Sequence, residues 1–212
     1  MPGVRAIVPV KSYALAKQRV RRLQPEHRRD LAQRLVRTVV DALLRSDLLE
    51  ELLLVGDGDA RDLARQVGGT WVKDPGLGLN AAVAAGLERC HRLSDRLVVM
   101  GDLPLLGPDD VRASLAHRSP VTLFASRSGA GTNAVLHRAG YGMPPLFGGA
   151  SLARHLAWAA RGALAVEVAY ETGFALDVDT DADLLLARRR GFPFPCADGL
   201  PGVAAGVDPI QA

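Results

Sequence analysis

Acidic side chains follow two apolar stretches, at points where a buried strand is expected to end. The first, Asp102, comes after the apolar run at 97–100 and after Gly101. Apolar runs without alternation are typical of strands buried on both faces of a sheet, and open α/β sheets bind ligands at the carboxyl ends of such strands. A carboxylate there suits a metal-binding or phosphate-linked role. An Asp-X-Pro sequence such as Asp102-Leu103-Pro104 is also typical of a turn that enters a helix.

A second pair of carboxylates lies in Asp177-Val178-Asp179, which we expect directly after the last strand. Alternate side chains of an extended segment share a face, so Asp177 and Asp179 would point the same way. Mg²⁺ binds a few carboxylates together with substrate phosphate oxygens and waters. Asp102, Asp177 and Asp179 therefore predict a Mg²⁺ site. Helix capping is the alternative for the acids that follow, but Asp177 comes too early to cap a helix.

Three cations follow the first predicted strand in one loop, namely Lys11, Lys17 and Arg19. A basic loop in this place, at the edge where ligands bind, could reach a polyanion such as a triphosphate. The glycines of a P-loop are absent, so we do not expect a backbone cradle of that kind. The alternative is the start of an amphipathic helix that carries exposed cations.

Two glycine-containing loops open helices further along the chain. The loop 73–80 ends in Leu79 and Asn80, and the loop 147–151 ends in Ser151, four residues before His155. Helix starts carry unpaired N–H groups and a partial positive charge, so the first loop suits contacts with a base or ribose. The alternative for Asn80 is a helix N-cap. The sequence leaves open whether His155 has a structural role or contacts the substrate.

Predicted strands alternate with predicted helices from residue 4 to residue 190. We expect strands at 4–10, 52–55, 70–72, 97–100, 121–125, 134–136 and 163–169, and helices at 28–49, 60–67, 81–93, from 108, 152–160 and 184–190. This alternation predicts an α/β fold in which a mostly parallel sheet has helices on both faces. We expect one domain over 1–190, followed by a Pro/Gly-rich tail at 191–212 that wraps the surface or lacks order.

Composition narrows the class of protein. The 212 residues are 48% hydrophobic and 23% charged, with a net charge of +3. We find no signal segment and no apolar run long enough to span a bilayer, so we expect a cytoplasmic protein without a membrane partner. Cys90 and Cys196 form no disulfide framework or metal spacing. No basic run is interleaved with aromatic residues, which argues against nucleic acid as a partner.

Taken together, the motifs resemble the 2-phospho-L-lactate/phosphoenolpyruvate guanylyltransferase family of coenzyme F-420 biosynthesis. The matching segments, which run in order from residue 5 to about 190, are Pro9-Val10-Lys11-Ser12, Leu79-Asn80, Gly101-Asp102-Leu103-Pro104, Gly131-Thr132-Asn133-Ala134, Phe147-Gly148 and Asp177-Val178-Asp179-Thr180. The family belongs to a wider nucleotidyltransferase group, so the resemblance implies a Rossmann-like three-layer α/β/α fold with a mixed sheet, of the nucleotide-diphospho-sugar transferase type.

The resemblance also implies roles for these residues. Asp102 and Asp177, with Asp179 in support, would hold Mg²⁺. The catalytic set would be Asp102 with three cations that face the GTP triphosphate, Lys11, Lys17 and Arg19. Leu79, Asn80 and Gly101 would lie beside the nucleoside. The residues expected to bind the phosphorylated acid are Thr132, Asn133, Gly148, Ser151 and His155.

The acceptor stays open among 2-phospho-L-lactate, 3-phospho-D-glycerate and phosphoenolpyruvate. Members that use phosphoenolpyruvate commonly have a small residue where this chain has Asn133, so the resemblance favours the other two acids. The expected reaction is in-line attack of the acceptor phosphate on the α-phosphorus of GTP, which releases pyrophosphate and needs no protein nucleophile.

Two other functions fit the motifs less well. A molybdenum-cofactor or sugar-phosphate nucleotidyltransferase would carry a Gly-rich loop with an arginine where Pro9-Val10-Lys11-Ser12 stands. A non-catalytic nucleotide-binding regulator would be favoured by the loss of one acidic site, and both sites are intact. The sequence does not decide whether the protein forms a homodimer.

Overall fold

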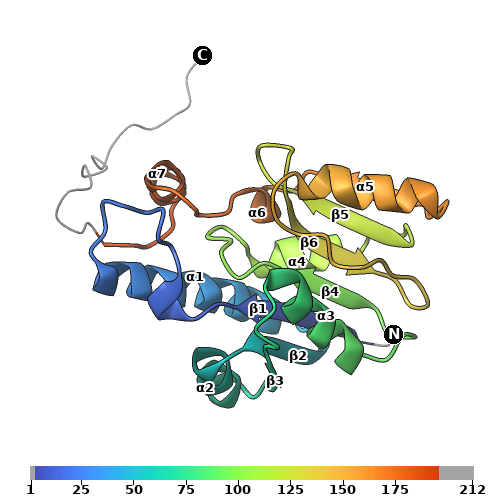
Figure 1. Cartoon of the computed structure of the whole chain (residues 1–212), viewed down its shortest axis with the longest axis horizontal. Helices are drawn as coiled ribbons and strands as arrows, with labels where there is room; N and C mark the ends of the chain where they lie inside the picture. The colour runs from blue at the N-terminus through green and yellow to red at the C-terminus, as the bar shows by residue number, and fades with distance from the viewer. Residues whose placement is uncertain (1–2, 196–212) are drawn as a thin grey trace.

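The computed structural model describes residues 3–195, which form an α/β fold around one mixed sheet (Figure 1). Its seven strands lie in the order β3-β2-β1-β4-β6-β5-β7. They are β1 Val4–Val10, β2 Leu49–Gly56, β3 Thr70–Lys73, β4 Arg96–Val99, β5 Val121–Ala125, β6 Thr132–His137 and β7 Val166–Ala169. The predicted strands are all present, with ends shifted by a few residues.

The connections between strands are helical. They are α1 Pro25–Leu44, α2 Gly58–Val67, α3 Leu79–Arg89, α4 Pro108–Ser114, α5 Ser151–Arg161, α6 Thr172–Ala175 and α7 Asp181–Arg189, with a short 3-10 helix η1 at Tyr13–Leu15. The longest, α1, buries Leu31, Leu35, Val39 and Leu43, four positions that recur at the helical period.

One strand of the sheet is reversed. The neighbours of β1 pair with it in parallel, but β6 is antiparallel to both β4 and β5. The start of β6, at Thr132, therefore lies at the same edge as the carboxyl ends of β1 and β4. This reversal brings the loop before β6 to the edge where parallel strands bind ligands.

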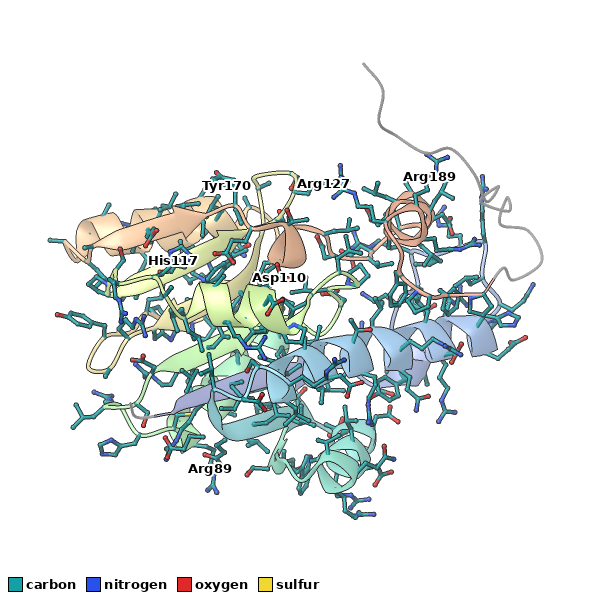
Figure 2. The ribbon with its side chains drawn as sticks, turned by 180° about the vertical axis from the view of Figure 1, so that it is seen from behind. Arg89, Asp110, His117, Arg127, Tyr170 and Arg189 are labelled. Atoms are coloured by element: carbon teal, nitrogen blue, oxygen red, sulfur yellow. The ribbon has the colours of Figure 1, made fainter. Side chains whose placement is uncertain are left out.

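The side chains of each strand alternate between two apolar cores. In β1, Ala6 and Val8 pack into one core with α1, α2, α4 and α6, whereas Ile7 packs into the other with α3 and α5. Figure 1 shows α3 and α5 in front of the sheet, and Figure 2 shows α1 and α4 in front of the opposite face. The predicted three-layer arrangement is confirmed.

Three details differ from the sequence-based expectation. Helix α1 ends at Leu44, because the chain turns there and enters β2 at Leu49. The segment that carries Asp177 and Asp179 does not follow the last strand directly, since the short helix α6 lies between β7 and this segment. The described start of the predicted tail is ordered against the domain, because Phe192 and Phe194 are buried against α1 and α7. Residues 196–212, including Cys196, lie outside the described part of the chain.

None of the helices within residues 3–195 combines the length and the apolar composition that a membrane span requires. The longest, α1, has a polar face that includes Arg34, Arg37 and Asp41.

His117, in the connection between α4 and β5, is held by two carboxylates from the last third of the chain. Its Nδ1 lies 2.8 Å from Glu167 Oε1 on β7, and its Nε2 lies 2.7 Å from Glu171 Oε1 at the start of α6. Burial opposes a charge on the ring, but the two carboxylates outweigh it and raise the pKa of His117. The labelled His117 lies on the face shown in Figure 2. This contact fixes α6, and with it the start of the segment that carries Asp177.

Replacing His117 by Gln should destabilise the protein in a pH-dependent way. Because the folded-state pKa is raised, the stabilisation is complete below about pH 6.5 and is lost as the pH rises through the folded-state pKa. We expect His117→Gln to lower the free energy of unfolding by about 1–2 kcal/mol near pH 6 and by less near pH 9, as measured by urea denaturation. The exposed His27→Gln is the matched control. Equal losses for His117→Gln at both pH values would contradict the charged contact.

Candidate active site

A cavity of about 660 Å³ opens at the carboxyl edge of β1, β2 and β4. Residues predicted to bind the nucleotide or the metal line it from separate parts of the chain, namely Lys11, Lys17 and Arg19 after β1, Leu79 at the start of α3, Gly101 and Asp102 after β4, and Asp179 before α7. The edge thus collects residues that are up to 168 positions apart in the sequence, from Lys11 to Asp179. Figure 1 shows the blue loop after β1 running toward the red segment that enters α7.

The cationic loop is held in place by a carboxylate of α2. Asp59, in the first turn of α2, accepts a hydrogen bond of 2.8 Å from the backbone N–H of Tyr13. The ends of β1 and β2 also approach closely, since a Cβ at Gly56 would lie 2.3 Å from the carbonyl oxygen of Val10. This packing requires glycine at position 56. Asp59 and Gly56 therefore fix the path of the chain between Lys11 and Lys17.

Two of the predicted cations contact two of the predicted metal ligands. Lys17 Nζ lies 2.8 Å from Asp102 Oδ2 and 3.7 Å from Asp179 Oδ1, and Arg19 is paired with Asp179. The Lys17 side chain is only 10% exposed, whereas that of Arg19 is 68% exposed. The Lys17 pairs are therefore shielded from water, and the Arg19 pair is a surface contact of low energy.

The segment between α6 and α7 is attached to the sheet edge by backbone hydrogen bonds. The N–H of Val178 donates to the carbonyl of Asp102 at 3.1 Å, and the N–H of Arg127 donates to that of Ala175 at 2.6 Å. Val178 is fully buried, so the flanking Asp177 and Asp179 share the outer side, as expected for an extended segment. Thr180 then caps α7, with Asp183 as the reciprocal partner.

The carboxylates of Asp102, Asp177 and Asp179 form one electrostatic group. Burial, followed by the charges of Asp102 and Asp179, raises the pKa of Asp177. Within residues 3–195 no three His, Cys, Asp or Glu side chains form a ready metal cage. Mg²⁺ does not require one, because it takes a few carboxylates and completes its shell with phosphate oxygens and waters. The all-oxygen donor set at the mouth of an anion-sized cavity fits this ion.

Asn80 connects the nucleotide-facing loop to the second glycine loop. Its side chain accepts a hydrogen bond of 2.7 Å from the N–H of Phe147 and donates one of 3.2 Å to the carbonyl of Phe147. Gly78 precedes the first turn of α3 and is the N-cap, so the alternative of Asn80 as the cap is wrong. Leu79 faces the cavity, but Asn80 does not line it.

Three of the five residues predicted to bind the acceptor form a buried hydrogen-bonded set. Ser151 Oγ accepts from the N–H of Thr132 at 2.8 Å, and Thr132 Oγ1 lies 3.1 Å from His155 Nδ1. The other ring nitrogen of His155 accepts from the N–H of Leu146 at 3.2 Å. Burial lowers the pKa of His155 to about 4, so the ring is neutral and fills the structural role. This set fixes the loop before α5, in which Gly148 is exposed and has a φ of 107°.

Asn133 acts on the acidic segment. Its amide donates to the carbonyl of Phe174 at 2.9 Å and to that of Ala175 at 3.4 Å, and it lies 3.4 Å from Asp177 Oδ1. The amide therefore positions the segment that carries Asp177. None of its contacts favours one phosphorylated acid over another.

Sequence reasoning missed two acids that bear on the cavity, Asp59 and Asp74. Asp59 fixes the cationic loop through the Tyr13 N–H, and Asp74 lines the cavity. The signal for Asp59 was its place directly after β2, beside the expected end of β1. Its partner is a backbone N–H 46 residues away, which no sequence pattern indicates.

Comparisons with solved structures support the fold. A putative nucleotide-diphospho-sugar transferase from Desulfovibrio desulfuricans G20 matches with a TM-score of 0.74 and 16% identity, over 94% of this chain and 93% of that one. A 4-diphosphocytidyl-2C-methyl-D-erythritol synthase from Anaerococcus prevotii DSM 20548 matches with a TM-score of 0.58 and 13% identity, over 89% and 98%. At these identities the likeness shows the nucleotidyltransferase-type fold alone.

Comparisons with known sequences identify the family of this chain. The model of the family described as "Guanylyl transferase CofC like" matches residues 4–187. A phosphoenolpyruvate guanylyltransferase of Conexibacter woesei is 37% identical over 200 residues, which cover 88% of this chain and 90% of the relative. One of Sphaerobacter thermophilus is 34% identical over 185 residues, which cover 84% and 89%. The resemblance drawn from the motifs is confirmed, and the chain belongs to the CofC-like guanylyl transferase family.

Proposed function

We propose that this chain transfers GMP from GTP to the phosphate of phosphoenolpyruvate or a closely related three-carbon acid, within coenzyme F-420 biosynthesis. A phosphate oxygen of the acceptor forms a bond to the α-phosphorus of GTP, and the bond to the β-phosphate oxygen breaks to release pyrophosphate. The observation that carries the proposal is the cavity, which Lys11, Lys17 and Arg19 line together with Asp102 and Asp179.

The chain's own groups position the reactants and neutralise charge. A phosphate monoester is already an anion at neutral pH, so the attack needs no general base and no covalent intermediate. Lys11, Lys17 and Arg19 supply cations for the triphosphate, and Leu79 packs beside the nucleoside. Mg²⁺ bound at Asp102, Asp177 and Asp179 would neutralise charge on the phosphate oxygens. Bringing both reactants together in line accounts for a large share of the rate.

The acceptor's place is the exposed glycine loop at 147–150, beside the start of β6. The buried set of Thr132, Ser151 and His155 holds this loop, and Asn80 joins it to the nucleotide side. The relatives' names favour phosphoenolpyruvate, whereas the sequence pattern at Asn133 favoured the other two acids. The Asn133 amide is engaged by backbone carbonyls, so the proposal takes phosphoenolpyruvate as the preferred acceptor.

The direct test of this function is pyrophosphate release by the purified protein with GTP and Mg²⁺. We expect release only when phosphoenolpyruvate, 2-phospho-L-lactate or 3-phospho-D-glycerate is added, with the highest kcat/KM for phosphoenolpyruvate. Mass spectrometry should show the guanylylated acid, and replacing GTP by ATP or CTP should lower the rate. The absence of release with all three acids would contradict the proposal.

Asp102→Ala should lower kcat by about 10²- to 10³-fold, the range for the loss of one electrostatic contact in a transition state. The same substitution leaves the β4 strand and its backbone bonds intact but removes the partner of the covered Lys17 ammonium, so we expect a folded protein that unfolds at a lower temperature. Asp109→Ala, at a solvent-exposed carboxylate on α4, is the matched control and should keep the wild-type rate. Turnover by Asp102→Ala at the wild-type rate would contradict the proposed role of Asp102.

A further inference from the structure

Lys17 lies where two proposed functions meet, binding of the metal and binding of the triphosphate. Its ammonium touches the carboxylates of Asp102 and Asp179, which are the proposed metal ligands, and it also belongs to the loop proposed for the triphosphate. An ammonium that lies 2.8 Å from Asp102 Oδ2 competes with a divalent cation for that oxygen. Two cations at the same carboxylate also repel each other. We therefore expect a metal-nucleotide complex to displace Lys17 from the carboxylates.

Backbone conformation and burial show that the contact is built into the loop. Lys17 has a φ of 55°, in the left-handed region that favours glycine over lysine. This turn directs the side chain inward, where 90% of its surface is covered, although neighbouring loop residues such as Lys11 are exposed. Lysine heads usually reach water, so a covered ammonium indicates a specific partner. That partner is the Asp102 carboxylate.

The charges at the edge balance in two different ways. In the free protein, Lys17 and Arg19 offset two of the three negative charges of Asp102, Asp177 and Asp179. Within residues 3–195 Asp177 has no ion pair and is approached only by the Asn133 amide. A divalent cation at the carboxylates supplies the same two positive charges, which frees Lys17 and Arg19 for the triphosphate. The summed charge of the three carboxylates and the cations paired with them is the same in both arrangements.

We propose that Lys17 keeps the divalent-cation site closed until a nucleotide arrives, because its ammonium holds Asp102 and Asp179 in the free protein and moves to the triphosphate when the metal-nucleotide complex binds. This inference rests on the proposed function, since it assigns the metal and the triphosphate to the same cavity. Its consequence is an order of binding. The free protein takes up divalent cations weakly, and the metal enters together with the nucleotide.

The test measures Mn²⁺ affinity without any nucleotide, by following the electron paramagnetic resonance signal of unbound Mn²⁺. Lys17→Met removes the ammonium and keeps an unbranched side chain. We expect it to bind Mn²⁺ about tenfold more tightly than the wild type, within the range typical of coupled sites. Lys17→Gln is a second variant for the case in which Lys17→Met does not fold, as judged by thermal unfolding.

Lys11→Met is the matched control, because Lys11 lies in the same loop and makes no ion pair within the described residues. Lys11→Met removes the same charge without removing an ion pair, so it measures only the long-range electrostatic effect. We expect its Mn²⁺ affinity to change less than about twofold. Equal tightening by Lys17→Met and Lys11→Met would overturn the proposal. So would unchanged affinity in folded Lys17→Met and Lys17→Gln. Pyrophosphate release by the wild type tests the proposed function separately.

Discussion

The ion pair between Lys17 and Asp102 is the contact on which the organisation of this edge depends. It joins the loop after β1 to the loop after β4, two neighbouring strands whose carboxyl ends form the floor of the cavity. The acidic segment before α7 joins the same group through Asp179 and through the backbone bond from Val178 to Asp102. Opposite charges from three parts of the chain thus meet at one place, as recognition of an anionic substrate with a cation requires.

The reversed strand β6 brings a second group of residues to this edge. An antiparallel strand between β4 and β5 starts where its neighbours end, which brings Thr132 and Asn133 to the cavity side of the sheet. Asn133 holds the acidic segment, and Thr132 holds the glycine loop before α5 through Ser151 and His155. The edge that carries the acidic segment and the glycine loop before α5 are therefore coupled through adjacent residues of one strand.

Local patterns predicted the elements well, because apolar runs and the periodic Leu and Val of α1 report burial directly. They also located the acids and cations, since the ends of strands are marked by Gly101 and by the change from apolar to polar residues. Long-range contacts could not be predicted in this way. The Asp59 bond to the Tyr13 backbone, the Asn133 bonds to carbonyls near α6, and the direction of β6 depend on tertiary packing. For the same reason, Thr132, Ser151 and His155 were predicted as substrate contacts, although their side chains are engaged with one another.

The most direct measurement of the central claim is a crystal structure with Mg²⁺, a non-hydrolysable GTP analogue and phosphoenolpyruvate. The account predicts the metal at the carboxylates of Asp102 and Asp177, the triphosphate against Lys11, Lys17 and Arg19, and the acceptor phosphate beside the 147–150 loop. A triphosphate bound elsewhere, or a Lys17 ammonium still paired with Asp102 while the metal-nucleotide complex is bound, would contradict it.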